Sequence, residues 1–100
     1  MTFTLNQIYT VKINSGEELI AKVLAVENNF ITVSDPVSIA PGPKGMGLVP
    51  SMFTADPGSE VRLNINSISL YGLTEDNVKM KYIEAVTGIS LPGKKNIILG

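Results

Sequence analysis

The chain has 100 residues, of which 44% are hydrophobic, and its eight Lys and Arg residues against nine Asp and Glu residues leave a net charge of −1. A chain of this length forms one domain and hides about two thirds of the surface that its unfolded form exposes. Cysteine and histidine are absent, which excludes disulfides, thiolate chemistry and the usual zinc sites. We therefore expect a single domain over residues 1–100 that uses no metal or cofactor.

The N-terminal residues have neither the basic start nor the apolar core of a signal peptide, and no run approaches the ~20 apolar residues of a membrane span. These features predict a cytoplasmic protein that does not enter a membrane. The basic residues are scattered along the chain. The monomer therefore lacks the basic face that nucleic-acid-binding proteins usually present.

The chain opens with two predicted strands joined by a turn. Residues 9–14 alternate apolar and polar side chains with the two-residue period of a half-buried strand. Gly16 lies in the turn that follows, where glycine adopts a positive φ without steric cost. The next strand, residues 18–26, is apolar at both parities. Both of its faces should be covered, as in a strongly bent strand of a small barrel or a strand that a neighbouring subunit covers.

Turn and breaker residues organise the middle of the chain. The Glu-Asn-Asn turn at residues 27–29 leads into a strand over residues 30–34. Asp35-Pro36 interrupts this strand because proline cannot donate to a ladder, and residues 37–40 continue the path after a bend. Residues 41–47 are rich in glycine and proline and predict a long hairpin loop with Lys44 near its tip.

A strand over residues 48–53 comes next, and its Pro50 predicts an edge or a bulge. The turn at residues 56–59 precedes a strand over residues 61–71, whose apolar positions change parity at Asn66-Ser67. This change predicts a bulge or a sharp bend there. Gly72 ends the β region.

The C-terminal part predicts one helix over residues 75–87, with Thr74 as its N-cap and Gly88 as its stop. The expected apolar face of this helix consists of Val78, Tyr82, Ile83 and Val86. Residues 89–100 hold a Pro-Gly turn between two apolar fragments, and form either an added hairpin or a tail that packs on a partner. Together, these patterns predict a mainly β fold: a small five-stranded bent SH3-like barrel over about residues 9–72, with one C-terminal helix.

Residues 14–33 resemble the first sequence motif of the Sm-like (Lsm) family. In that motif a turn glycine opens the second strand, and a polar loop with an acidic residue leads into the third. Gly16 and Glu27 match these two positions. Residues 61–71 are similar to the second motif, and residues 45–50 with the helix after the barrel look most like the divergent phage-associated members. The other matching positions are Leu19, Val23, Leu63, Asn66 and Ile68.

The resemblance implies a cytoplasmic homo-oligomeric ring of five to seven subunits, phage-encoded in a bacterial host, that binds single-stranded RNA or acts as an RNA chaperone. Edge strands of an open barrel carry unpaired N–H and C=O groups, and head-to-tail pairing between identical subunits satisfies them and closes a ring. A ring repeats each contact, so multivalent binding offsets a weak site in each subunit. The alternative is a structural or protein-interaction ring without RNA binding.

The chain also departs from the family pattern, and the missing Arg-Gly pair, with the near-zero net charge, motivates this alternative. Asn64 and Ile65 stand where the second motif has Arg-Gly, which removes a side chain that contacts nucleotide in the family. Counted without gaps from Gly16, Ile31 falls where RNA-binding members carry their base-recognising asparagine, whereas a loop two residues shorter aligns Asn29 with it. The helix follows the barrel here, while the standard family places it before the first strand.

The candidate RNA-binding residues are Asn28, Asn29, Phe30, Asn66 and Lys44. For the three asparagines, turn chemistry is the favoured interpretation because turns favour asparagine. Phe30 is either a stacking platform for a base or, as its place in the alternation favours, a core residue. The loop around Lys44 lacks the G-x-x-x-x-G-K-[ST] spacing of a phosphate cradle and is interpreted as a hairpin connection.

Catalysis is not expected. No serine or threonine stands in a recognisable nucleophile context, and the chain has no histidine or cysteine. Glu17 and Glu18 are adjacent, so on a strand they would point to opposite faces and not form an acid–base pair. The sequence therefore predicts a binding or structural protein rather than an enzyme.

Overall fold

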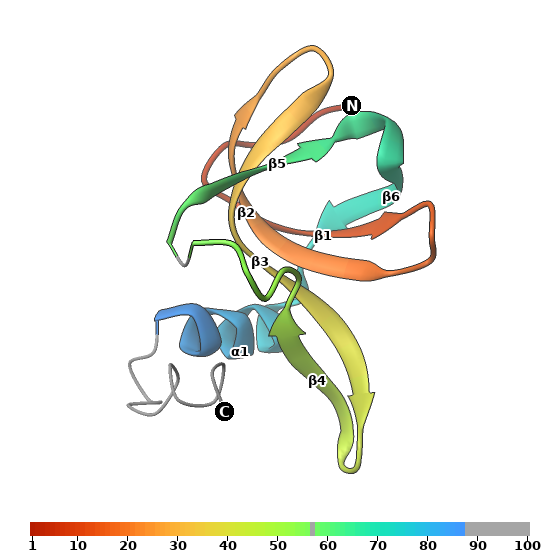
Figure 1. Cartoon of the computed structure of the whole chain (residues 1–100), viewed down its shortest axis with the longest axis vertical. Helices are drawn as coiled ribbons and strands as arrows, with labels where there is room; N and C mark the ends of the chain where they lie inside the picture. The colour runs from red at the N-terminus through yellow and green to blue at the C-terminus, as the bar shows by residue number, and fades with distance from the viewer. Residues whose placement is uncertain (57, 88–100) are drawn as a thin grey trace.

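The computed structural model describes residues 1–56 and 58–87, which form one antiparallel sheet followed by a helix (Figure 1). The strand order is β4-β3-β2-β1-β6, and β5 pairs with β3 beside this path. This arrangement confirms the mainly β fold with a C-terminal helix. The elements are β1 (Ile8–Ile13), β2 (Glu18–Val26), β3 (Phe30–Gly42), β4 (Gly45–Pro50), β5 (Glu60–Asn64), a 3₁₀ turn η1 (Ile65–Ser67), β6 (Ile68–Leu73) and α1 (Asp76–Thr87).

Strand β3 is long and bent, and its two halves have different neighbours. Residues 30–34 pair with β5, whereas residues 37–42 pair with β4. Between the halves Asp35 has a φ of 49°, and the register with β2 shifts at the same point. The Asp35-Pro36 interruption predicted from the sequence is therefore a bend within one continuous strand.

Two predicted boundaries were wrong. A long loop was expected at residues 41–47, but β3 continues to Gly42 and β4 begins at Gly45, so that only Pro43 and Lys44 form the turn. The φ of 108° at Gly45 makes this short turn possible. Strand β4 ends at Pro50, so residues 51–53 lie outside it. The expected strand over residues 61–71 is divided into β5 and β6 by a 3₁₀ turn at residues 65–67, which is the sharp bend predicted at the parity change, and the register of β6 with β1 shifts just after it.

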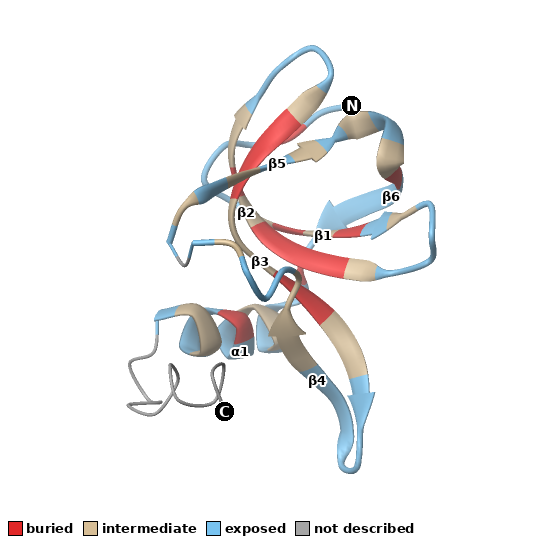
Figure 2. Cartoon of the chain, in the orientation of Figure 1, coloured by how far each residue is buried: buried red, intermediate tan, exposed pale blue. Residues whose placement is uncertain are grey.

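Strand β2 is covered on both faces, as its double-sided apolar pattern predicts (Figure 2). Its odd-numbered residues Leu19, Ala21 and Val23 join a cluster with β1, β3 and the N-terminal Phe3. Ile20, which is 1% exposed, belongs to a second cluster with Val37 of β3 and Tyr82 of α1. The second face is therefore covered in part by the chain's own helix.

The helix is fixed on the bend of β3 by a buried tyrosine. Tyr82 is 2% exposed, and its hydroxyl donates to the backbone oxygens of Ser34 at 3.1 Å and Asp35 at 2.9 Å. Val78 and Val86 of the predicted apolar face pack beside it, but Ile83 is 40% exposed. Burial of the aromatic ring and this hydroxyl bond together hold α1 against the sheet.

The cap of the helix differs from the prediction. Oε2 of Glu75, not the hydroxyl of Thr74, accepts the N–H of Val78 at 2.9 Å. This hydrogen bond lowers the pKa of the Glu75 carboxyl below its ordinary value of 4.5. Thr74 is buried, and its hydroxyl forms a 2.9 Å hydrogen bond with the hydroxyl of Thr10. The predicted stop at Gly88 and the tail over residues 89–100 lie outside the described residues.

Candidate nucleic-acid interface

The turn between β2 and β3 meets the turn between β5 and β6 at one end of the molecule (Figure 1). The backbone N–H of Ile65 donates to the backbone oxygen of Asn29 at 2.9 Å. Phe30 and Asn64 are partners in the register of β3 with β5. These contacts bring Asn28, Asn29 and Phe30 close to Asn66, although Ile65 lies 35 positions after Phe30 in the sequence (65 minus 30). We call this set, with Asn64 and Arg62, the polar end.

Hydrogen bonds fix the turn at Asn66, and Asn66 takes part in them through its backbone atoms. The Asn66 N–H donates to Oδ1 of Asn64 at 2.9 Å, and the Asn66 backbone oxygen accepts from Nδ2 of Asn14 at 2.9 Å. Asn28, Asn29 and Asn66 are all exposed. Within the described residues no hydrogen bond to the side-chain amide of any of these three was found. The turn interpretation therefore accounts for the backbones of Asn29 and Asn66, while the side-chain amides of all three asparagines stay available to a ligand.

Phe30 carries a cation on its ring and is half-buried, so it is not a full member of the core. The guanidinium carbon of Arg62 lies 4.8 Å from the centre of the Phe30 ring. Arg62 pairs with Thr32 in the register, which makes it a diagonal neighbour of Phe30 on the same face of the sheet. A contact of this kind is worth roughly 0.5–1 kcal/mol at an exposed site. It also places a positive charge beside an aromatic face, a combination on which nucleobases stack.

Arg62 is the residue of this site that the sequence interpretation missed. The chain shows it only as an isolated cation in a predicted strand. Its meeting with Phe30 depends on the register between β3 and β5, which no local pattern of the sequence specifies.

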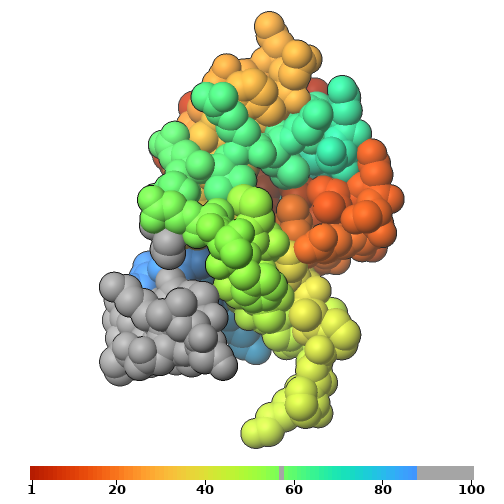
Figure 3. Space-filling view, in the orientation of Figure 1, coloured from red at the N-terminus to blue at the C-terminus, as the bar shows by residue number. Residues whose placement is uncertain are grey.

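Lys44 does not belong to the polar end. It lies in the turn between β3 and β4, at the tip of a hairpin that projects from the opposite end of the molecule (Figures 1 and 3). Both Lys44 and the nearby Met46 are exposed, Met46 by 69%. The structure therefore brings four of the five predicted residues together and separates the fifth.

Charge at the polar end is nearly balanced. Arg62 contributes one cation, and Glu27, which lies in the same turn as Asn28, contributes one carboxylate. The Glu27 N–H closes this turn by donating to the backbone oxygen of Phe30 at 2.9 Å. A single copy of the site thus offers stacking and amide hydrogen bonds more than electrostatic attraction for phosphates.

Three strands, β4, β5 and β6, each have a free edge. In the part of the chain that the structure describes, β4 and β5 each pair with β3 alone, and β6 pairs with β1 alone. One row of backbone N–H and C=O groups on each of these strands therefore lacks a strand partner. Strand β6 also exposes Leu70 by 64% and Leu73 by 68%. Unpaired edges with exposed apolar side chains favour pairing with another chain.

Among residues 1–56 and 58–87, no cluster of acidic side chains has the grouping needed to hold a metal ion. The helix in this part of the chain is too short and too polar to cross a membrane. The sequence matches no protein-family model, and it has no significant similarity to a curated protein.

Proposed function

We propose that copies of this chain assemble head to tail into a ring of the Sm-like type, in which β5 of one copy pairs with β6 of the next. The free edges of β5 and β6 support this proposal because they lie on different strands of the same chain. A contact between two different surfaces repeats around a rotation axis and closes when the rotation fits. Each subunit is then a small bent SH3-like barrel whose open edges its neighbours complete.

The exposed side chains of β6 give this assembly a direct test. Leu70→Lys with Leu73→Lys adds two charges to the strand that joins the next copy, so native mass spectrometry should show a shift from a ring of five to seven subunits to monomers. Met80→Lys is the matched control, since Met80 is 63% exposed on α1 and belongs to neither of the two strands that we propose to pair. A native protein that is strictly monomeric would refute the ring.

We further propose that the ring binds single-stranded RNA at the polar end of each subunit, without catalysis. The observation that carries this proposal is the 2.9 Å hydrogen bond from Ile65 to Asn29, which unites the two turns. Phe30 with Arg62 would stack a base, and the amides of Asn28, Asn29 and Asn66 would bond to base edges or sugars. Repetition around the ring would offset the low charge of one copy.

Fluorescence anisotropy with U-rich and A-rich oligonucleotides tests this function. Affinity should fall with salt, with a slope of about −0.7 per neutralised phosphate. Phe30→Ala removes the platform and should weaken binding about tenfold, since base stacking on an aromatic side chain is worth ~1–3 kcal/mol. Lys81→Gln, an exposed cation of α1, is the control and should leave binding nearly unchanged. Absence of binding at low salt by an intact ring would refute RNA binding.

A structural or protein-interaction ring is the second candidate. The near balance of Arg62 and Glu27 at the polar end favours it, as does the turn role of the asparagine backbones. This candidate predicts a purified ring free of nucleic-acid absorbance that copurifies with one specific protein. A ring isolated with bound RNA that Phe30→Ala releases would exclude it.

A further inference from the structure

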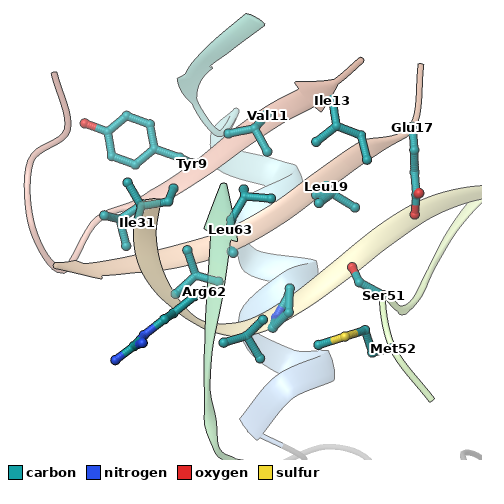
Figure 4. Close-up of a pocket in the computed structure, with 15 residues that line it drawn as sticks. Tyr9, Val11, Ile13, Glu17, Leu19, Ile31, Ser51, Met52, Arg62 and Leu63 are labelled. Carbon is teal, nitrogen blue, oxygen red and sulfur yellow. The ribbon is translucent and has the colours of Figure 1, made fainter. Parts of the chain in front are cut away.

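A cavity of about 230 Å³ lies between the inner faces of β1, β2 and β3 and strand β5 (Figure 4). Its walls are mostly apolar side chains, and Val61 and Leu63 on the β5 side are only half-buried. An apolar cavity of ~150 Å³ is enough to take up benzene. The space therefore accommodates an apolar body of about six carbons. The residues of the inner wall include Val11, Leu19, Ala21, Val23, Ile31 and Val33.

One end of this cavity is polar. Glu17 and Ser51 line it together, at the end away from Tyr9 and Ile31 (Figure 4). Behind them Ser38, which is 6% exposed, donates its hydroxyl proton to Oε2 of Glu17 and lies 3.0 Å from the hydroxyl oxygen of Ser51. A buried polar group is thus used to orient the carboxylate at the cavity wall.

The direction of these hydrogen bonds determines which groups the Glu17 end of the cavity offers to a ligand. A serine hydroxyl has one proton, and Ser38 gives its proton to Glu17, so the bond between the two serines must be donated by Ser51. The chain of donation therefore runs from Ser51 through Ser38 to Glu17. Oε1 of Glu17 and the lone pairs of Ser51 remain as acceptors. A ligand that is complementary to this end must bring hydrogen-bond donors.

No cation neutralises Glu17 within the described residues, where the one ion pair is that of Lys79 with Asp76. Arg62 also lines the cavity, but its guanidinium lies over the Phe30 ring at 4.8 Å and points away from Glu17 (Figure 4). A cationic donor is therefore favoured over a neutral one, since hydrogen bonds to an ionised acceptor are the stronger kind.

We propose that this cavity binds a small primary amine, whose apolar body fills the interior and whose ammonium group donates to Glu17 and Ser51. An ammonium group has three donors and no acceptor, which is the complement of the acceptors at this end. The site uses neither the amides of the polar end nor the backbone edges of β5 and β6. Its failure and that of the proposed ring are therefore distinguishable.

Three probes of equal chain length separate the apolar and the polar contributions. We expect n-hexylamine to cause saturable shifts of the methyl NMR signals of Val11, Val23 and Ile31 in the native assembly. The same shifts should occur with n-hexanol at lower affinity, and hexanoate should have the lowest affinity of the three. The amine should bind about tenfold more tightly than hexanoate, because the carboxylate of Glu17 attracts the first and repels the second. Equal affinity of the three probes, or no saturable shift, would overturn the proposal.

Two variants locate the site. Glu17→Gln should reduce the affinity for hexylamine to that for hexanol, whereas Glu84→Gln on α1, also exposed, should leave the preference for the amine unchanged. Ala21→Leu extends a 6% exposed side chain into the cavity and should abolish binding of all three probes. Retained preference for the amine in Glu17→Gln would overturn the role of Glu17. Retained binding in a folded Ala21→Leu protein would place the ligand elsewhere.

Discussion

Replacing Tyr82 with phenylalanine removes the hydroxyl that joins α1 to the bend of β3. One hydroxyl proton serves two acceptors, the backbone oxygens of Ser34 at 3.1 Å and Asp35 at 2.9 Å. A net hydrogen bond is worth about 1 kcal/mol, and an acceptor left without its donor away from water raises the cost to about 1–3 kcal/mol, of which these half-buried acceptors should show the lower part. We expect Tyr82→Phe to lower the free energy of unfolding by about 1–2 kcal/mol, since the aromatic ring stays in place.

Urea unfolding measures this change as a lower midpoint with an unchanged slope. Tyr71→Phe is the matched control, because the Tyr71 hydroxyl accepts the Thr2 N–H at 2.9 Å at a position where the residue is 39% exposed. The control should stay within about 0.5 kcal/mol of the native protein. A Tyr82→Phe protein as stable as the control would refute the argument that this hydroxyl fixes the helix.

The same hydroxyl predicts a pH dependence. Burial, with the charge of Asp35 as a second cause, raises the pKa of Tyr82 above its ordinary value of 10.0. Above pH 10 the unfolded chain loses this proton while the folded protein keeps it, so stability is full below pH 10 and falls as the pH rises toward the folded pKa. Tyr82→Phe should lack this part of the decrease. An equal loss of stability in both proteins above pH 10 would contradict the predicted shift.

Three further changes probe the rest of the fold. Gly45→Ala should lower the free energy of unfolding by about 1–2 kcal/mol in thermal or urea unfolding, because the φ of Gly45 is 108°. Gly72→Ala is the control and should cost less, since a Cβ added at either glycine contacts no neighbouring atom but Gly72 lacks the positive φ. Glu75→Gln should lower the melting temperature near neutral pH. It should have little effect well below pH 4.5, where the Glu75 carboxyl of the native protein also becomes protonated. The same decrease in melting temperature at both pH values would contradict a role for the charge of Glu75. Ile20→Ala should lower the free energy of unfolding by about 2–5 kcal/mol, even in the variant with Leu70→Lys and Leu73→Lys, because α1 of the same chain covers Ile20. Val26→Ala, at a position that is 41% exposed, should be nearly neutral.

Local patterns of the sequence were enough to predict most strands and the helix. The alternation of residues 9–14 predicted β1 to within one residue at each end, and the boundaries of β2 agree with the prediction. Side chains alternate across a strand whatever its partner, and a turn glycine has access to positive φ in any context. Such features depend on neighbours in the chain, so the sequence by itself determines them.

The covering of β2 shows where this determination stops. The double-sided apolar pattern required that both faces be covered, but it did not distinguish a bent strand from a subunit contact. The tertiary structure placed Tyr82 of α1 over Ile20, 62 residues away along the chain (82 minus 20). The cap of α1 was likewise decided by packing, because Thr74 is buried against Thr10 and leaves Glu75 to accept the Val78 N–H.

The candidate sites divide in the same way. The sequence singled out Asn28, Asn29, Phe30 and Asn66, since turn residues and an aromatic beside them are visible locally. The register of β3 with β5 brings these residues together and places Arg62 against Phe30. The direction of the β3–β4 hairpin keeps Lys44 away from both. The donation from Ser51 through Ser38 to Glu17 likewise joins three separate segments. Register and packing depend on which distant residues fit one another, so only the tertiary structure decided them.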